Sequence, residues 1–346
     1  MTDTHSPITG DDPTTTIALV EQADLLRPMA LRVAATLRLA DHIGEAGATL
    51  DDLAEATATN APSLRRLLDY LVAQGWFTAR DGHYYVAPAG RPLRGDAQFS
   101  VAQALDVRSA VGRSQVALVG MLHTIKTGAP CHETIFGASY WDDLNGSPQF
   151  LETMRQEGNR TLTYGGEEIL HGFDWSSANT VIDLGGNNGL VLLTLLETHP
   201  HLSGATMDLA NFTSIASEEI AAAGLEDRAE AIEVSFFEEL PKGYDVYLLS
   251  GIFNDWQDAD VVRILTRVAE AVTDETRIRV AEINLRYELM TPEVEAMELY
   301  MSTVVPAPVR TPQDIRELAA EAGLEVVSVR EENPFRTLFE LRRRQV

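Results

Sequence analysis

Apolar and polar residues follow two different periods along the chain, and the change between them divides the sequence. Up to about residue 170, apolar residues recur mainly at helical spacing, whereas from Thr180 onwards short apolar runs alternate with helical stretches. Strands that alternate with helices are typical of βαβ units, so residues 171–346 predict a Rossmann-like, doubly wound α/β domain. The predicted strands lie at 180–184, 205–209, 231–234, 244–250 and 277–284, with a terminal strand pair at 324–331 and 336–344.

A winged-helix pattern precedes this domain. Thr49 starts a capping-box pattern that opens a short helix, and Asn60 is placed to cap a second helix, which Gly75 ends. Two short strands joined at 81–82 follow. Helix, helix and hairpin together predict a winged helix, which either binds DNA or serves as a dimerisation or substrate-capping module.

The residues around this module are mainly helical in pattern. The stretch 28–43 predicts one helix that is apolar on nearly all sides, with Pro28 in its first turn. One small domain can hardly bury such a helix, so we expect a subunit interface there. Residues 98–170 also read as helical, with breaks at 127–130 and 146–148, whereas residues 1–15 read as a polar tail.

Charge and cysteine content narrow the function classes. The chain has 346 residues with 27 Lys and Arg against 52 Asp and Glu, a formal net charge of −25. This charge argues against nucleic acid or an anionic membrane surface as the main partner. The single cysteine, Cys131, excludes an intramolecular disulfide and fits a cytoplasmic protein. We expect no targeting segment and no membrane span, because the first 26 residues lack Lys and Arg and no apolar run is long enough.

A glycine-rich turn follows the first predicted strand of the α/β domain, at residues 183–189. The dinucleotide fingerprint would require glycine at two positions where this chain has Asn187 and Leu190, so dinucleotide binding is disfavoured. An acid two residues before the glycines, Asp183, suits a ligand that carries an ammonium or sulfonium group. Asp208 ends the next strand, where it can accept hydrogen bonds from a ribose diol. The alternative is a structural turn with Asp183 as a solvated acid.

Several motifs, taken in order, resemble one enzyme family. The run VIDLGGNNG resembles the first motif of S-adenosylmethionine-dependent methyltransferases, and LRPMALRVAATLRLADHI resembles the dimerisation helix of small-molecule O-methyltransferases. The segments YWDDLNGSPQFLETM and LLSGIFNDWQDADVVRIL resemble that family's substrate-capping helix and catalytic-base segment. The nearest members are the anthracycline-type tailoring enzymes. The resemblance implies a tail at 1–15, a winged-helix dimerisation domain at 16–97, a helical connector and substrate cap at 98–170, and an S-adenosylmethionine-binding domain at 171–346.

The same resemblance implies a homodimeric methyltransferase that acts on an aromatic or polyketide-like small molecule, with S-adenosylmethionine as cofactor. We expect no metal, because no spacing of two histidines and a carboxylate stands out in the sequence. The resemblance assigns catalytic roles to Asn254, Asp255 and Glu282. The implied cofactor-binding residues are Asp183, Gly185, Gly186, Gly189, Asp208, Ser235, Phe236 and Ser250. The implied substrate-binding residues are Trp141, Met154, Asn254 and Met301.

Four positions depart from the family pattern. Asn187 replaces a glycine, Ser235 replaces the acid on the adenine side, and Val309 replaces an acid of a later motif. Most importantly, Asn254 stands where the family has its base histidine, and an asparagine amide cannot take up a proton at neutral pH.

The missing histidine leaves two interpretations open. The enzyme either methylates a substrate that ionises unaided or uses another base such as Asp255 or Glu282, or it has kept the scaffold and become a hydroxylase, decarboxylase or cyclase. His123 and His132 are further candidates for a substitute base, although histidines in such helical segments are more often surface or packing residues.

Overall fold

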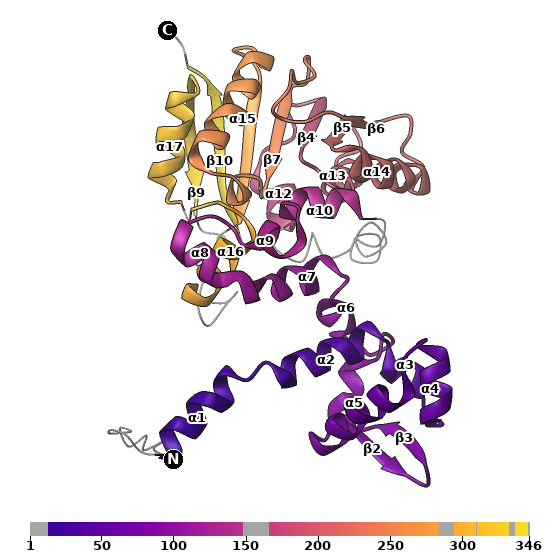
Figure 1. Cartoon of the computed structure of the whole chain (residues 1–346). Helices are drawn as coiled ribbons and strands as arrows, with labels where there is room; N and C mark the ends of the chain where they lie inside the picture. Colours follow the sequence, from indigo (N-terminus) through magenta and orange to yellow (C-terminus); the bar gives the residue numbers. More distant parts are fainter. Residues whose placement is uncertain (1–12, 148–165, 284–293, 309, 332–335, 345–346) are drawn as a thin grey trace, which may run out of the picture. The chain divides into compact units, whose positions relative to one another are not determined.

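The computed structural model describes residues 13–147, 166–283, 294–308, 310–331 and 336–344 (Figure 1). The chain folds into two compact units, Met1–Arg113 and Ser114–Val346. The units therefore part within the stretch 98–170, which the sequence analysis treats as a single connector.

The first unit contains the predicted order of helix, helix and hairpin. The capping box at Thr49 is present, since Thr49 Oγ1 accepts the Asp52 N–H and the Asp52 carboxylate accepts the Thr49 N–H. Asn60 caps the next helix by accepting the Ser63 N–H. The elements are α1 (Pro13–Ala23), α2 (Leu26–Thr36), α3 (Leu39–Ile43), β1 (Ala48–Thr49), α4 (Leu50–Ala56), α5 (Ala61–Ala73), β2 (Phe77–Arg80), β3 (His83–Val86), η1 (Pro88–Leu93) and α6 (Ala102–Leu105). The three strands form an antiparallel sheet in the order β1-β3-β2.

The single helix predicted for 28–43 is wrong, because the chain breaks it into α2 and α3. Arg38 between them has φ of +51°, in the left-handed region that an α-helix cannot contain. The break turns α3 so that Leu39, Ala40 and Ile43 lie buried in the core of the first unit. The apolar residues of this stretch are thus divided between that core and a surface.

The second unit is built on a seven-stranded sheet with the order β6-β5-β4-β7-β8-β10-β9 (Figure 1). Strands β6 to β8 pair in parallel, whereas β10 is antiparallel to both of its neighbours. The predicted doubly wound domain and its terminal strand pair are confirmed. The strands are β4 (Thr180–Leu184), β5 (Ser203–Asp208), β6 (Ala229–Glu233), β7 (Val246–Ser250), β8 (Arg277–Ile283), β9 (Leu324–Arg330) and β10 (Arg336–Arg343).

Both faces of this sheet are covered. Along β4, Val181 packs into one buried apolar cluster, whereas Ile182 and Leu184 pack into another on the opposite face. The described helices of this unit are α7 (Ala110–Val116), which starts in the first unit, η2 (Ala117–Gly120), α8 (Met121–Thr127), α9 (His132–Phe136), α10 (Tyr140–Gly146), α12 (Gly166–Gly172), α13 (Leu190–Thr198), α14 (Ala210–Ala223), η4 (Phe253–Asp255), α15 (Asp258–Ala271), α16 (Val294–Val304) and α17 (Pro312–Glu321). No helix in the described part of the chain is long and apolar enough to cross a bilayer.

Candidate active site

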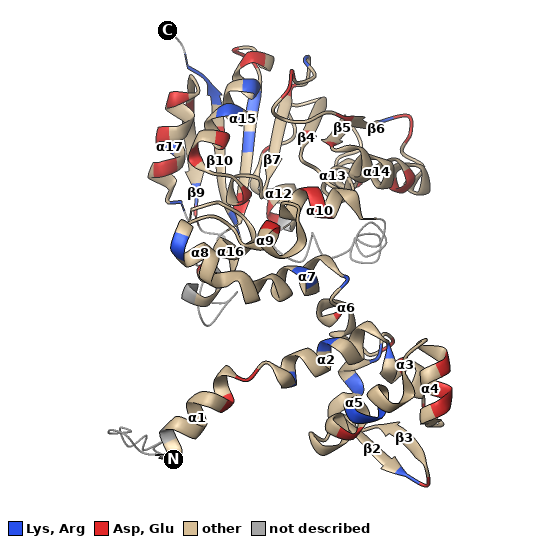
Figure 2. Cartoon of the chain, in the orientation of Figure 1, with Lys and Arg blue, Asp and Glu red and all other residues tan. Residues whose placement is uncertain are grey.

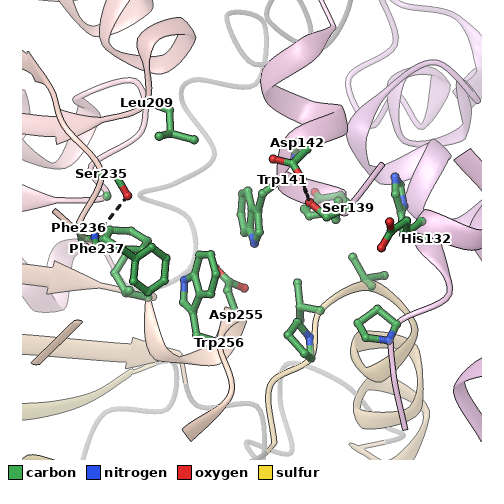
Figure 3. Close-up of a pocket in the computed structure, with 18 of the residues that line it drawn as sticks. His132, Ser139, Trp141, Asp142, Leu209, Ser235, Phe236, Phe237, Asp255 and Trp256 are labelled. Atoms are coloured by element: carbon green, nitrogen blue, oxygen red, sulfur yellow. Dashed lines mark hydrogen bonds between the residues drawn. The ribbon is translucent and has the colours of Figure 1, made fainter. Parts of the chain in front are cut away.

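A pocket of about 780 Å³ opens in the second unit (Figure 3). One wall comes from residues that follow the carboxyl ends of β4, β5, β6 and β7, and the facing wall comes from α8, α9 and α10. In an open parallel sheet, ligands bind outside the carboxyl ends of the strands, where the chain order reverses. Here β4 lies between β5 and β7, so the pocket is at such a reversal.

The glycine turn after β4 brings backbone to the edge of this pocket. Gly185 has φ of +72°, and a Cβ there would lie 2.5 Å from Ile252 Cδ1. A Cβ on Gly186 would lie 2.2 Å from Thr206 Oγ1, so neither position accepts a side chain. Asn187 has φ of +54°, a conformation that asparagine tolerates better than most residues, and it lines the pocket together with Gly185. Gly189 also needs its left-handed φ of +77°, but it does not line the pocket.

Asp183 lies buried beneath this turn. Neither of its carboxylate oxygens has a hydrogen-bond partner among the described residues. Burial raises the pKa of Asp183 to about 7, and the nearby charge of Asp208 adds to the rise, whereas Arg336 opposes it. A buried carboxylate without partners is costly unless it is neutral or close to a cation. Asp183 therefore fits a ligand that brings a positive charge to the turn.

Asp208 ends β5 and faces the pocket. Its Oδ1 accepts the Leu209 N–H at 2.7 Å, and its Oδ2 accepts the Asn187 N–H at 2.9 Å. Burial raises the pKa of Asp208 to about 6, although these two backbone hydrogen bonds act in the opposite direction. A carboxylate held in this way at a strand end can accept further hydrogen bonds from a ribose diol. The donor set around the turn thus fits S-adenosylmethionine.

Aromatic rings form the wall after β6. The rings of Phe236, Phe237 and Trp256 contact one another with centroid separations of 4.9 to 5.5 Å. The hydroxyl of Ser235 accepts the Phe237 N–H at 3.3 Å, which orders the start of this wall (Figure 3). Trp141 lines the pocket from α10, opposite these rings. A flat aromatic ligand fits between such walls.

The loop after β7 carries the residues to which the sequence assigns catalysis, and the structure separates them. Asp255 lines the pocket. Burial raises the pKa of Asp255 well above its ordinary range, and the charge of Glu282 adds to the effect. Asn254 does not line the pocket, because its side-chain amide donates to the Ile283 carbonyl at 3.2 Å.

Glu282 also lies behind the pocket and not in it. Its Oε1 accepts the N–H groups of Ile252 and Phe253 at 3.1 and 3.0 Å, and its Oε2 accepts the Asn254 N–H at 3.3 Å. Burial raises the pKa of Glu282, while these hydrogen bonds lower it. A carboxylate engaged in this way orders the loop that carries Asn254.

Of the remaining predicted site residues, some line the pocket and others lie outside its lining. Ser250 ends β7 and accepts a hydrogen bond from Arg336 at 3.2 Å, but it does not line the pocket. Met301 on α16 is half-buried and likewise lies outside the lining, and Met154 lies outside the described residues. His123 and His132 both line the pocket, and His132 Nε2 lies 2.8 Å from Asp143 Oδ2.

Sequence reasoning missed a residue, Arg310, that contacts the loop after β7. Arg310 donates to two carbonyls of the loop after β7, those of Phe253 and Trp256, each at 2.6 Å. The signal that could have found it is its place in the family motif: Arg310 directly follows Val309, the position where this chain lacks the family's acid. Val309 itself lies outside the described residues.

Comparisons with known proteins agree with this geometry. A family model of the O-methyltransferase domain matches residues 121–325, and a model of the O-methyltransferase dimerisation domain matches residues 21–93. The chain is 38% identical to 2,7-dihydroxy-5-methyl-1-naphthoate 7-O-methyltransferase of Streptomyces carzinostaticus, over 90% of this chain and 93% of that protein. It is 32% identical to aclacinomycin 10-hydroxylase RdmB of Streptomyces purpurascens, over 94% and 88% of the two chains.

A solved structure extends the likeness to three dimensions. The crystal structure of NcsB1, an O-methyltransferase from neocarzinostatin biosynthesis, holds S-adenosyl-L-homocysteine and 1,4-dihydroxy-2-naphthoic acid. It superposes on this chain with a TM-score of 0.84 and 36% sequence identity, covering 94% of this chain and 98% of that one.

Proposed function

The chain belongs to the O-methyltransferase family and is an S-adenosylmethionine-dependent enzyme, and we propose that it methylates a hydroxyl group of a fused-ring aromatic natural product with Asp255 as the proton acceptor. The position of Asp255 carries this proposal. It is the carboxyl of the loop after β7 that reaches the pocket, next to Trp256 and across from Trp141 (Figure 3). The substrates named for the naphthoate relatives are of this aromatic class.

The residues around the glycine turn would hold the cofactor. When bound, S-adenosylmethionine supplies an electrophilic methyl group on a sulfonium. Gly185, which lines the pocket, would allow the ligand to approach the backbone closely, and Asp208 would accept hydrogen bonds from its ribose. The buried carboxylate of Asp183 favours the positive charge at the amino-acid end.

Asp255 suits the proton transfer because it lines the pocket and is itself partly buried. Its raised pKa brings it closer to the pKa of a phenolic hydroxyl, so that proton transfer in the transition state is less uphill than to an ordinary carboxylate. The aromatic walls fix the plane of the substrate, and alignment of the acceptor oxygen supplies a large part of the rate enhancement. The hydroxyl proton would move to Asp255 as the oxygen–methyl bond forms and the methyl–sulfur bond breaks, with S-adenosyl-L-homocysteine as the leaving group.

The test uses methyl-labelled S-adenosylmethionine with a panel of hydroxynaphthoic acids and dihydroxynaphthalenes, and product mass as the readout. We expect label in a methyl ether, and a rate that rises with pH as Asp255 loses its proton. Asp255→Asn should remove this limb and lower kcat by about 10² to 10⁴-fold, the usual contribution of a general base. Asp142→Asn is the matched control, because Asp142 also lines the pocket but accepts a hydrogen bond from Ser139 at 2.6 Å. Unchanged kcat in Asp255→Asn would refute the proposed base.

A second candidate function is a non-methylating reaction on the same scaffold. It is favoured by Asn254 at the family's base position and by the similarity to a protein named as a hydroxylase. The same incubations separate the two, because conversion of substrate without consumption of the cofactor would support this candidate.

We also propose that the enzyme is a homodimer. The match to a dimerisation domain supports it, as does a group of exposed apolar residues on α1, on α2 and between them. These residues are Ile17, Leu19, Val20, Leu25, Leu26, Met29 and Val33.

A further inference from the structure

The loop between β7 and α15 is too short to hold its own conformation. Its regular part is the single 3-10 turn η4, and such turns have poor hydrogen-bond geometry. Phe253 within it is fully buried, and its carbonyl accepts only a 3.3 Å hydrogen bond from the Trp256 N–H inside the turn, so its backbone polar groups take their closer partners from elsewhere. The conformation of this loop decides where Asp255 and Trp256 point.

Two oppositely charged side chains supply those partners from outside the loop. Glu282 at the end of β8 accepts the N–H groups of three successive residues, beginning with Ile252. Arg310, just before α17, donates Nη1 to the Phe253 carbonyl and Nη2 to the Trp256 carbonyl, both at 2.6 Å. The N–H groups are thus bound by an anion and the carbonyls by a cation.

Arg310 is suited to this task by its shape as well as by its charge. Its side chain is only 5% exposed, and its planar guanidinium presents donors to two carbonyls that lie on either side of Asp255. Its Nε donates to Asp258 at 2.8 Å, but that carboxylate is 62% exposed and contributes little as an ion pair. The two carbonyls therefore account for the buried position of the guanidinium better than Asp258 does.

We propose that Arg310 is a positioning residue for the reaction, which acts with Glu282 to fix the loop so that Asp255 and Trp256 face the substrate. This inference rests on the proposed role of Asp255. Lysine at position 310 keeps the positive charge, but its single ammonium group lacks the two separate NH₂ groups of a guanidinium. It can therefore donate to one of the two carbonyls and not to both. A loop released on one side lets the Asp255 carboxyl move relative to the acceptor oxygen.

The experiment compares Arg310→Lys and Arg310→Gln with wild type in kcat, KM, the pH profile and affinity for S-adenosyl-L-homocysteine. A misplacement of about 1 Å costs about 10²-fold in rate, so we expect kcat to fall by about 10- to 100-fold. The affinity for S-adenosyl-L-homocysteine should stay within about two-fold of the wild-type value. The pocket residues after β4 and β5, which would hold that ligand, do not include Arg310. The pH limb of Asp255 should shift in Arg310→Gln.

Two controls separate positioning from general stability. Asp258→Asn removes the ion pair but leaves both carbonyl bonds, and Arg316→Gln removes an exposed arginine of α17 that donates to the Val326 carbonyl. Both controls should retain kcat. If the Arg310 variants fail to fold, as judged by lost binding of the homocysteine compound, Glu282→Gln tests the same loop from its other side and should lower kcat.

The outcomes distinguish this inference from the proposed function. Suppose that the rate of Asp255→Asn no longer rises with pH, but Arg310→Lys and Arg310→Gln keep wild-type kcat. The positioning role of Arg310 is then wrong, and the role of Asp255 as the base stands. If Asp258→Asn loses as much activity as Arg310→Lys, the ion pair and not the grip on the carbonyls is responsible, and the inference is overturned. If Asp255→Asn is fully active, the proposed base fails, whatever Arg310 does.

Discussion

Asp208 is the residue whose removal should weaken cofactor binding most directly. Its carboxylate accepts two backbone N–H groups and faces the pocket, so Asp208→Ala removes the ribose acceptor and leaves those N–H groups without it. Hydrogen bonds to a charged group contribute about 1.5 to 3 kcal/mol, and we expect S-adenosylmethionine binding to weaken by about that much in calorimetry. Asp142→Ala on the facing wall should bind the cofactor normally. Unchanged affinity in Asp208→Ala would exclude this residue from the cofactor site.

Asp183 should make cofactor binding depend on pH. Its pKa of about 7 means that the carboxyl carries a proton at pH 6 in the free enzyme. A bound positive charge favours the ionised form and lowers that pKa, so binding should release a proton and affinity should rise as pH rises from 5 to 7. Calorimetry of S-adenosyl-L-homocysteine in buffers of different ionisation enthalpy measures the release. Asp183→Asn should lose most of it; an equal release in this variant would point to another group.

The same raised pKa has a consequence for the stability of the free enzyme. Asp183 binds its proton more tightly when folded than when unfolded, since its ordinary pKa is near 3.8. The free energy of unfolding therefore falls as pH rises from about 4 towards 7. Thermal melts of Asp183→Asn without ligand should show a flatter decline over this range than wild type. A parallel decline in the two proteins would contradict the assignment.

Individual residues show most clearly how much of the candidate site could be predicted from sequence alone. The glycine turn, Asp208 and Asp255 could be located from motif spacing, because that spacing fixes which strand end each residue occupies. The roles of Asn254 and Glu282 could not, since both turn their polar groups to backbone behind the pocket. Spacing gives the register of a residue, but it does not show which backbone groups lack partners once the loop is folded.

At the scale of elements, the turn between β4 and α13 depends on glycine at one position above all. A Cβ on Gly186 would lie 2.2 Å from Thr206 Oγ1 and 2.6 Å from Asp183 Oδ2, which no rotation of the buried Thr206 and Asp183 side chains easily relieves. Gly186→Ala should therefore shift the turn and weaken binding of S-adenosyl-L-homocysteine by about ten-fold or more, as overpacking typically costs 1 to 3 kcal/mol. Gly146→Ala at the end of α10 is the control, because Gly146, like Gly186, has no positive φ and a Cβ there would meet open space. Equal binding by both variants would contradict this account.

Sequence patterns located the strands of the α/β domain close to their observed bounds, and failed where one residue leaves the regular conformation. The capping box at Thr49, the cap at Asn60 and the strand β4 were found at their observed positions, because their signals are local. The break at Arg38 was missed, since apolar residues continue across it at helical spacing. Arginine has no preference for the left-handed region, so the packing of α3 into the core, and not the residue type, selects this break.

Over the whole molecule, charge and apolar surface indicate different partners for the winged helix. Figure 2 shows Lys and Arg on α5 beside an acidic α4, and α5 contributes only Arg65 and Arg66 to a possible DNA-reading face. With a net charge of −25, this face offers too little positive charge to draw a phosphate backbone. Exposed apolar side chains are the more prominent feature of the first unit, at α1 and α2.

Those apolar side chains should be covered by a second copy of the chain. Leu19, Val20 and Leu26 are each 59% or more exposed, and such clusters usually mark interfaces in stable proteins. We expect wild type to behave in light scattering as two chains of 37.9 kDa, and Leu26→Asp to shift it towards the monomer, because a buried unpaired charge destabilises an interface. Val327→Asp changes an exposed apolar residue on β9 of the second unit and should leave the dimer intact. A monomeric wild type at micromolar concentration would show that the surface has another occupant.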